Sequence, residues 1–196
     1  MDRLRAKYNS MSVETKAALW FAMCNFINKG IAMIVVPLYT RMLTTEEYGM
    51  YTVFQSWLNI FIIIATLEIS RGHYITKYDE DVDNYTISVL GLSNIVTILF
   101  IVIYLCAIPV FNNLLEMPTY LVLSMFGYLL VYPAWEFWTI QQRFAYKYKT
   151  MVAATLAVAI LSPVIGVAGI YLLNMQSDAA IFSKLLIQGV FALCIY

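Results

Sequence analysis

The chain has 196 residues, of which 62% are hydrophobic and 12% charged, and its mean hydropathy is +0.75. A soluble domain of this size could not cover so much apolar surface with so few charges, so the composition predicts a polytopic all-α membrane protein. The formal net charge is zero, and the absence of a long basic tract argues against nucleic acid as a partner.

The first apolar run, residues 17–38, is long enough to span a bilayer, yet it carries Asn25, Asn28 and Lys29 near its middle. A lysine at that depth costs about 2.5–3.5 kcal/mol on insertion scales and needs a partner or a watery cavity. The three residues share one helical face with small residues such as Ala22. This pattern favours the wall of a polar cavity.

A purely structural role for Lys29 is the alternative. In that interpretation the lysine forms an ion pair or joins two helices, with Glu68, Glu136 or a helix beyond this sequence as its partner.

A new helix is predicted to begin after the connection that follows the first span. Thr44 and Glu47 have the S/T-x-x-E spacing of a capping box. The second span, residues 48–67, places Gln55 and Asn59 on one polar face. Buried amides either join helices or contact a ligand, so both interpretations stay open for these two residues.

Four more apolar runs complete one predicted transmembrane lobe over residues 1–196. We place these spans at residues 86–108, 119–140, 151–173 and 179–196. Pro109 ends the first of them, and a short loop is expected before residue 119. Gly166 and Gly169 suggest kinks or close helix packing. Lys184 is a second cation inside an apolar run.

The connections differ in basic charge. The N-terminal segment and the loops after the second and fourth spans together hold nine Lys and Arg residues, whereas the opposite side holds only Arg41. The positive-inside rule therefore predicts a multi-pass protein of the cytoplasmic membrane with a cytoplasmic N-terminus. The aromatic residues near the end of the fourth span, such as Trp135, are expected to lie at the interface between membrane and water.

No catalytic or metal-binding spacing is evident. Cys24, Cys106 and Cys194 are far apart in apolar runs, and His73 is the sole histidine. The acidic cluster in residues 79–83 lacks the glycine and ligand spacing of a calcium loop. We therefore expect no enzyme activity, no cofactor and no metal. Two lysines in apolar spans with few acids there indicate an anionic cargo.

The residues from Pro37 to Gly49, PLYTRMLTTEEYG, resemble the first-loop pattern P-L-x-T-R-x-L-[ST]-x-x-[DE]-[YF]-G of the polysaccharide-export flippases. These are the O-antigen, capsule and teichuronic-acid translocases of the multidrug/oligosaccharidyl-lipid/polysaccharide superfamily. The resemblance continues through Tyr51, Trp57 and the stretch at residues 71–74, and at lower fidelity through most of the chain.

The resemblance implies a transporter with two helical lobes around a central cavity. Members move polyprenyl-diphosphate-linked oligosaccharides from the inner to the outer leaflet by alternating access, coupled to an ion gradient, and cationic cavity residues hold the diphosphate. Arg41 matches the motif arginine, and Asn25 and Lys29 fall where the family places polar cavity residues. The substrate-contacting candidates are thus Asn25, Asn28, Lys29, Arg41, Gln55, Asn59 and Lys184.

Family members have two lobes, whereas this sequence offers six spans and ends inside the sixth. We therefore expect it to correspond to the N-terminal lobe and to lack transport on its own without a C-terminal lobe. Its partners would be lipid-linked oligosaccharide, membrane lipids and a coupling ion. Two alternatives are a drug/cation antiporter, which usually has an intramembrane acid where the first span has lysine, and an accessory subunit without transport.

Overall fold

The computed structural model describes residues 10–66, 82–173 and 176–195, which are almost entirely helical and contain no strand. Six helices are long and apolar enough to cross a membrane. The elements are α2 (Val13–Met42), α3 (Thr45–Thr66), α4 (Val82–Cys106), the short α5 (Ile108–Leu115), α6 (Thr119–Phe144), α7 (Tyr148–Leu173) and α8 (Gln176–Ile195). The prediction of an all-α membrane bundle with about six spans is confirmed.

Side chains cap the first two helices as their sequences dictate. Ser12 precedes α2, and its hydroxyl accepts a hydrogen bond from the Thr15 amide at 3.3 Å. Before α3, the Thr44 amide donates to Glu47 Oε2 at 2.7 Å and the Glu47 amide donates to Thr44 Oγ1 at 3.3 Å. This reciprocal pair is the predicted capping box, and it satisfies two amides that the helix backbone cannot.

The connection between α4 and α6 contains a helix where we expected a loop. α5 begins at Ile108, and Pro109 lies in its first turn, where a missing amide proton costs nothing. Asn112 holds the helix by accepting from the Tyr104 hydroxyl at 2.9 Å and donating to Thr119 Oγ1 at 2.8 Å. Pro109 therefore starts a helix here in addition to ending the preceding span.

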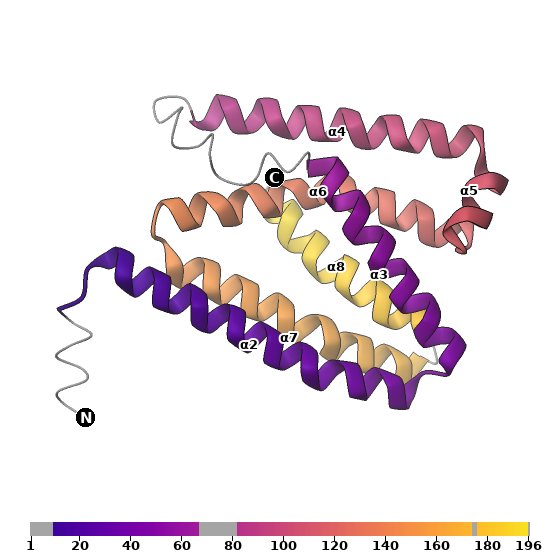
Figure 1. Cartoon of the computed structure of the whole chain (residues 1–196), viewed down its shortest axis with the longest axis horizontal. Coiled ribbons are helices and arrows are strands. Elements are labelled where there is room, and N and C mark those ends of the chain that lie inside the picture. Colours follow the sequence, from indigo (N-terminus) through magenta and orange to yellow (C-terminus); the bar gives the residue numbers. More distant parts are fainter. Residues whose placement is uncertain (1–9, 67–81, 174–175, 196) are drawn as a thin grey trace.

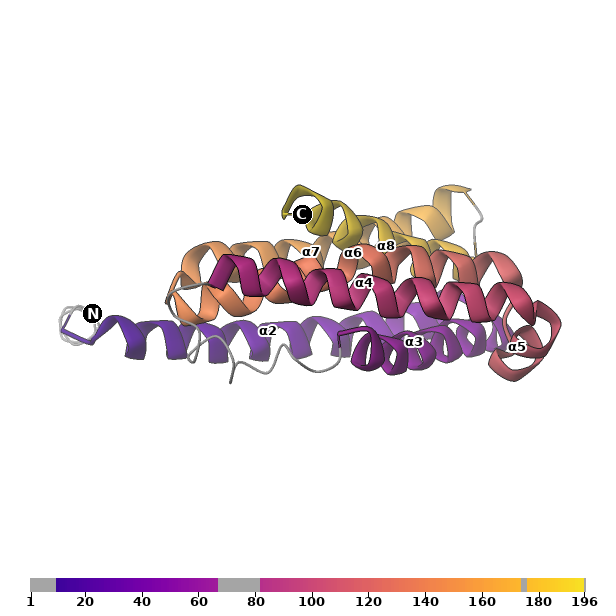
Figure 2. The same cartoon turned by 90° about the horizontal axis from the view of Figure 1, so that it is seen from above.

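The helices divide the molecule into two sides. Figure 2 shows α2 and α3 on one side and the C-terminal end of α8 on the other, with α6 between them. In Figure 1, α2 and α3 meet at their short connection and diverge toward the N-terminal end of α2. α7 lies along α2, and α8 contacts α3, α6 and α7.

α6 is the centre of the bundle. Its residues Leu121, Met125 and Leu129 are almost completely buried, and they pack with Phe54 and Leu58 of α3 in the main hydrophobic core.

The aromatic end of α6 is buried as well. Trp135 and Phe137 are 6% and 4% exposed, so other helices cover both side chains, and their expected position at the depth of the membrane interface stays a prediction. Trp135 stacks edge-on against Phe191 of α8, with ring centroids 5.9 Å apart. A helix covered on most sides by other helices buries its aromatic residues against them.

Two glycines of α7 allow α8 and α2 to approach closely, as predicted. A Cβ built on Gly169 would lie 2.9 Å from Ala179 Cβ. A Cβ on Gly166 would lie 2.9 Å from Ser183 Oγ and would collide with the Tyr39 hydroxyl. The absence of a side chain at Gly166 therefore lets three helices meet at one point.

Candidate functional site

Lys184 and Gln55 form the most direct polar link between distant parts of the chain. The Lys184 ammonium of α8 donates to Gln55 Oε1 of α3 at 2.6 Å, and both residues are half-buried. Because an ammonium group only donates hydrogen bonds, the amide oxygen must face it and the amide nitrogen must face away. Among the described residues no carboxylate pairs with this lysine, so a neutral amide is the partner of the charge.

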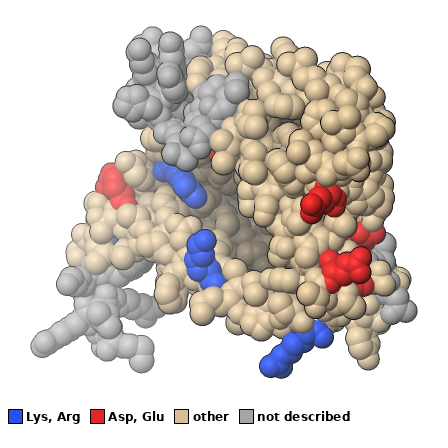
Figure 3. Space-filling model, turned by 45° about the vertical axis from the view of Figure 1, so that its right-hand side comes forward, with Lys and Arg blue, Asp and Glu red and all other residues tan. Residues whose placement is uncertain are grey.

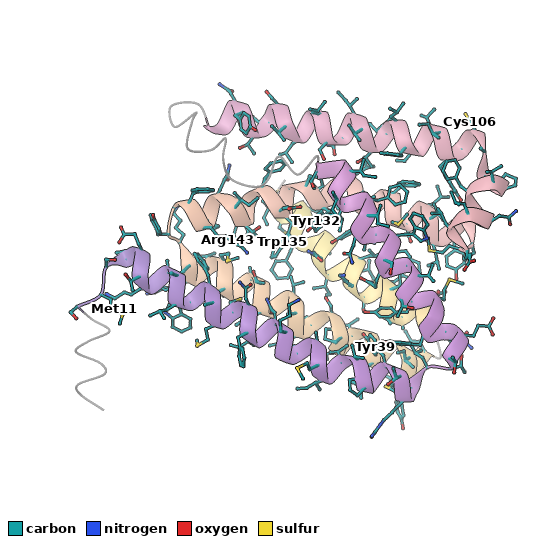
Figure 4. The ribbon with its side chains drawn as sticks, viewed as in Figure 1. Met11, Tyr39, Cys106, Tyr132, Trp135 and Arg143 are labelled. Carbon is teal, nitrogen blue, oxygen red and sulfur yellow. The ribbon has the colours of Figure 1, made fainter. Side chains whose placement is uncertain are left out.

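A cavity of about 250 Å³ lies beside this pair, mainly between α2, α7 and α8, with Tyr51 of α3 also in its lining. Lys184 lines it together with polar residues from each of the three helices, namely Asn28, Ser162, Ser183 and Gln188. We call this space the lysine cavity. The lining also includes Tyr39 of α2, which lies where α2, α7 and α8 converge (Figure 4).

Three polar atoms around the lysine cavity are buried without a hydrogen-bond partner. They are Asn28 Oδ1, Gln55 Nε2 and Ser162 Oγ, from α2, α3 and α7 respectively. Leaving a buried polar group unpaired costs about 1–3 kcal/mol, so such groups are rare unless something else satisfies them. Of these atoms, Gln55 Nε2 and Ser162 Oγ can donate to an anion, whereas Asn28 Oδ1 can only accept a hydrogen bond. Two unpaired donors near a lysine would stabilise an anionic ligand.

The other predicted site residues lie outside this cavity. Asn25 and Lys29 are exposed on α2, as are Ala22 and Val36, so this part of the predicted face is an exposed stripe. Asn28 and Ala32 of the same face line the lysine cavity. Arg41 is exposed in the last turn of α2, and Asn59 is exposed one turn after Gln55 on α3. The structure thus brings together Asn28, Gln55 and Lys184, and separates them from the remaining four.

The molecule is hollowed on the face shown in Figure 3, and basic side chains lie along the edge of the hollow. Exposed basic residues beside a concavity attract anions from a distance, because low-dielectric walls focus the electric field. The roles of Asn25, Lys29, Arg41 and Asn59 remain predictions.

Sequence reasoning missed four residues around the lysine cavity: Tyr39, Ser162, Ser183 and Gln188. Ser162 and Ser183 are 8% and 3% exposed, and such isolated serines in apolar spans resemble ordinary packing residues. A signal was nevertheless available for Ser162, because it precedes Pro163 and lies four residues before Gly166. A serine, a proline and a glycine so close together in an apolar span indicate a segment that packs against other helices and does not face lipid alone.

Several sequence-based candidates lie outside the described residues. They are Glu68, His73, the motif stretch at residues 71–74 and the acidic residues 79–81. Within residues 10–66, 82–173 and 176–195, no three His, Cys, Asp or Glu side chains are grouped as a metal site would require.

The six apolar helices and the large apolar residues on their outer faces, such as Phe26, Ile95 and Tyr171, define an α-helical membrane protein that spans the bilayer several times. A sequence model of the family described as "Polysaccharide biosynthesis protein" matches residues 15–196. The chain therefore belongs to the polysaccharide biosynthesis protein family, as the motif from Pro37 to Gly49 predicted. No curated protein and no solved structure matches the chain significantly.

Proposed function

We propose that the chain is one lobe of a transporter that flips polyprenyl-diphosphate-linked oligosaccharides from the inner to the outer leaflet of the cytoplasmic membrane. The observation that carries this proposal is Lys184, a half-buried cation beside a cavity with unpaired polar atoms. Membership of a polysaccharide biosynthesis family supports the saccharide part of the cargo. Flipping moves the lipid-linked oligosaccharide between leaflets without breaking a covalent bond, so the proposed activity needs no catalytic residue and no cofactor.

A diphosphate suits the lysine cavity because it supplies what the protein lacks there. The Gln55 amide leaves the Lys184 charge uncompensated, and an anion about 4 Å away would interact with it by about 4 kcal/mol at an effective dielectric constant of 20. The amide nitrogen of Gln55 and the hydroxyl of Ser162 are unpaired donors that phosphate oxygens can accept from. Binding would therefore satisfy the charge and the orphaned donors together.

The proposed orientation follows from the basic residues of the connections. With Lys147 and Lys149 in the cytoplasm, the N-terminus of α2 and the turn between α6 and α7 face the cytoplasm. We propose that the exposed stripe with Asn25 and Lys29 faces the central cavity, opposite a second lobe, and that transport is coupled to an ion. Arg41 and Asn59 would contact the cargo at other stages of its passage.

Binding of undecaprenyl diphosphate to the chain in lipid nanodiscs tests the proposal. We expect Lys184→Gln to weaken binding at least tenfold, because it removes the charge and keeps an amide of comparable length. The matched control is Lys147→Gln, which removes an exposed lysine from the turn before α7 and should change binding by less than twofold. Unchanged binding by Lys184→Gln, or an equal loss in the control, would contradict the proposal.

A further inference from the structure

A second and larger cavity, of about 800 Å³, lies between α2, α6 and α7. We call it the aromatic cavity. Its lining combines aromatic rings, one carboxylate, one guanidinium and hydroxyl groups, and the residues that the argument uses are Phe21, Tyr132, Trp135, Glu136, Arg143 and Thr155. The volume falls within the range of about 300–1,000 Å³ that is typical of small-molecule sites. Nothing in the proposed diphosphate site accounts for this cavity.

The polar groups of the aromatic cavity are held in position by α6. The Tyr132 and Glu136 side chains, one turn apart on α6, both line the cavity. Arg143, two turns further on, is exposed near the C-terminal end of the same helix. Figure 4 shows Tyr132, Trp135 and Arg143 in a row along the side of α6 that faces α2 and α7. A carboxylate and a guanidinium are therefore presented beside aromatic rings.

We propose that the aromatic cavity binds sugar rings of the lipid-linked oligosaccharide, an inference that rests on the function proposed above. A pyranose ring has apolar C–H faces and a rim of hydroxyl groups. Aromatic side chains with a negative π face attract such C–H groups. Glu136 can accept from two hydroxyls and Arg143 can donate to others, and charged groups form the stronger hydrogen bonds.

The charges of the cavity favour a neutral ligand over an ion. Glu136 would repel a phosphate group, which Lys184 in the neighbouring cavity would attract. An organic cation would be attracted by Glu136 and by the aromatic rings, but Arg143 in the same lining opposes it. A ligand with many hydroxyls and no charge satisfies both side chains.

The two cavities follow each other along α2 and α7. Phe21 lines the aromatic cavity and Asn28 lines the lysine cavity, seven residues or roughly 10 Å further along α2. On α7, Thr155 and Val158 line the two cavities in the same order. One lipid-linked oligosaccharide could therefore place its diphosphate in the lysine cavity and its first sugars in the aromatic cavity.

The order of the cavities also agrees with the proposed orientation. In the cytoplasmic leaflet the polyprenyl tail lies deepest, the diphosphate follows and the sugars point to the cytoplasm. The aromatic cavity lies nearer the N-terminus of α2, which is the proposed cytoplasmic end, and the lysine cavity lies deeper. A lipid-linked oligosaccharide loaded from the cytoplasm would place each group beside the matching cavity.

The test compares two probes on the whole chain in nanodiscs by native mass spectrometry: undecaprenyl diphosphate, and the same lipid carrying N-acetylglucosamine. We expect the wild-type chain to prefer the sugar-bearing lipid. Glu136→Gln and Tyr132→Phe should lower that preference, the former about tenfold, while binding of the bare lipid stays constant. The control Glu116→Gln removes an exposed carboxylate before α6 and should leave the preference intact.

Equal binding of both probes by the wild-type chain, or an unchanged preference in Glu136→Gln, would overturn the sugar site. Stronger binding of tetraphenylphosphonium than of either lipid, lost in Glu136→Gln, would overturn it in favour of a cation site. Lys184→Gln separates the two proposals, because it should weaken both lipids equally. If it weakens neither while Glu136→Gln still lowers the preference, the diphosphate site fails and the sugar site stands.

Discussion

Replacing Gln55 with leucine removes the partner of the Lys184 ammonium and leaves that charge half-buried beside an apolar side chain. A hydrogen bond to a charged group contributes about 1.5–3 kcal/mol, and the 2.6 Å distance indicates a strong one. We therefore expect Gln55→Leu to lower the free energy of unfolding by about 2 kcal/mol. The double variant Gln55→Leu/Lys184→Met should cost less than the sum of the single changes, since it removes both the charge and its partner.

The size of this coupling can be bounded. Hydrogen bonds between membrane helices average about 0.6 kcal/mol in double-mutant cycles and reach about 1.7 kcal/mol. Because the Lys184 bond to Gln55 is charge-assisted, we expect a coupling energy near the upper end, about 1.5 kcal/mol. Unfolding by SDS titration in mixed micelles measures all four proteins of the cycle. Additive effects, with a coupling energy of zero, would refute the reasoning that the pair acts as a unit.

Three other predictions concern packing, capping and topology. Gly166→Ala should destabilise the protein by about 1–3 kcal/mol through overpacking, whereas Gly127→Ala, whose Cβ would meet open space, should be neutral or stabilising in the same SDS titration. Thr44→Ala removes one half of the capping box and should cost about 1 kcal/mol, measured in the same way; no change would show that the cap is dispensable. In a variant without the native cysteines, Lys147→Cys should react with a membrane-impermeant thiol reagent only from the cytoplasmic side and Glu116→Cys only from the other side; the reverse pattern would invert the proposed topology.

Local signals in the sequence predicted the parts of the fold that depend on neighbouring residues. The capping box of Thr44 and Glu47 forms as expected because both partners lie within one turn. The close approach at Gly166 was also expected, since a glycine in an apolar helix commonly faces a neighbouring helix. α5 was missed because Pro109 both ends one helix and starts the next, and sequence alone did not separate these roles.

The candidate site was predicted less completely, because it depends on how each helix is rotated in the bundle. Asn28 and Lys29 are adjacent in sequence, yet Asn28 lines the lysine cavity and Lys29 is exposed. Lys184 is hydrogen-bonded to Gln55, which lies 129 positions earlier in the chain. The spacing of polar residues along one helix cannot predict a contact between helices so far apart in the sequence. Trp135 is buried for a similar reason, since other helices cover its end of α6.

The central claim is that Lys184 holds a diphosphate, and a structure of the chain in lipid with undecaprenyl diphosphate tests it most directly. The account predicts a phosphate oxygen about 2.8 Å from the Lys184 ammonium, with phosphate oxygens also accepting from Gln55 or Ser162. A diphosphate bound elsewhere, with the bond between Lys184 and Gln55 intact and the lysine cavity unoccupied, would contradict it.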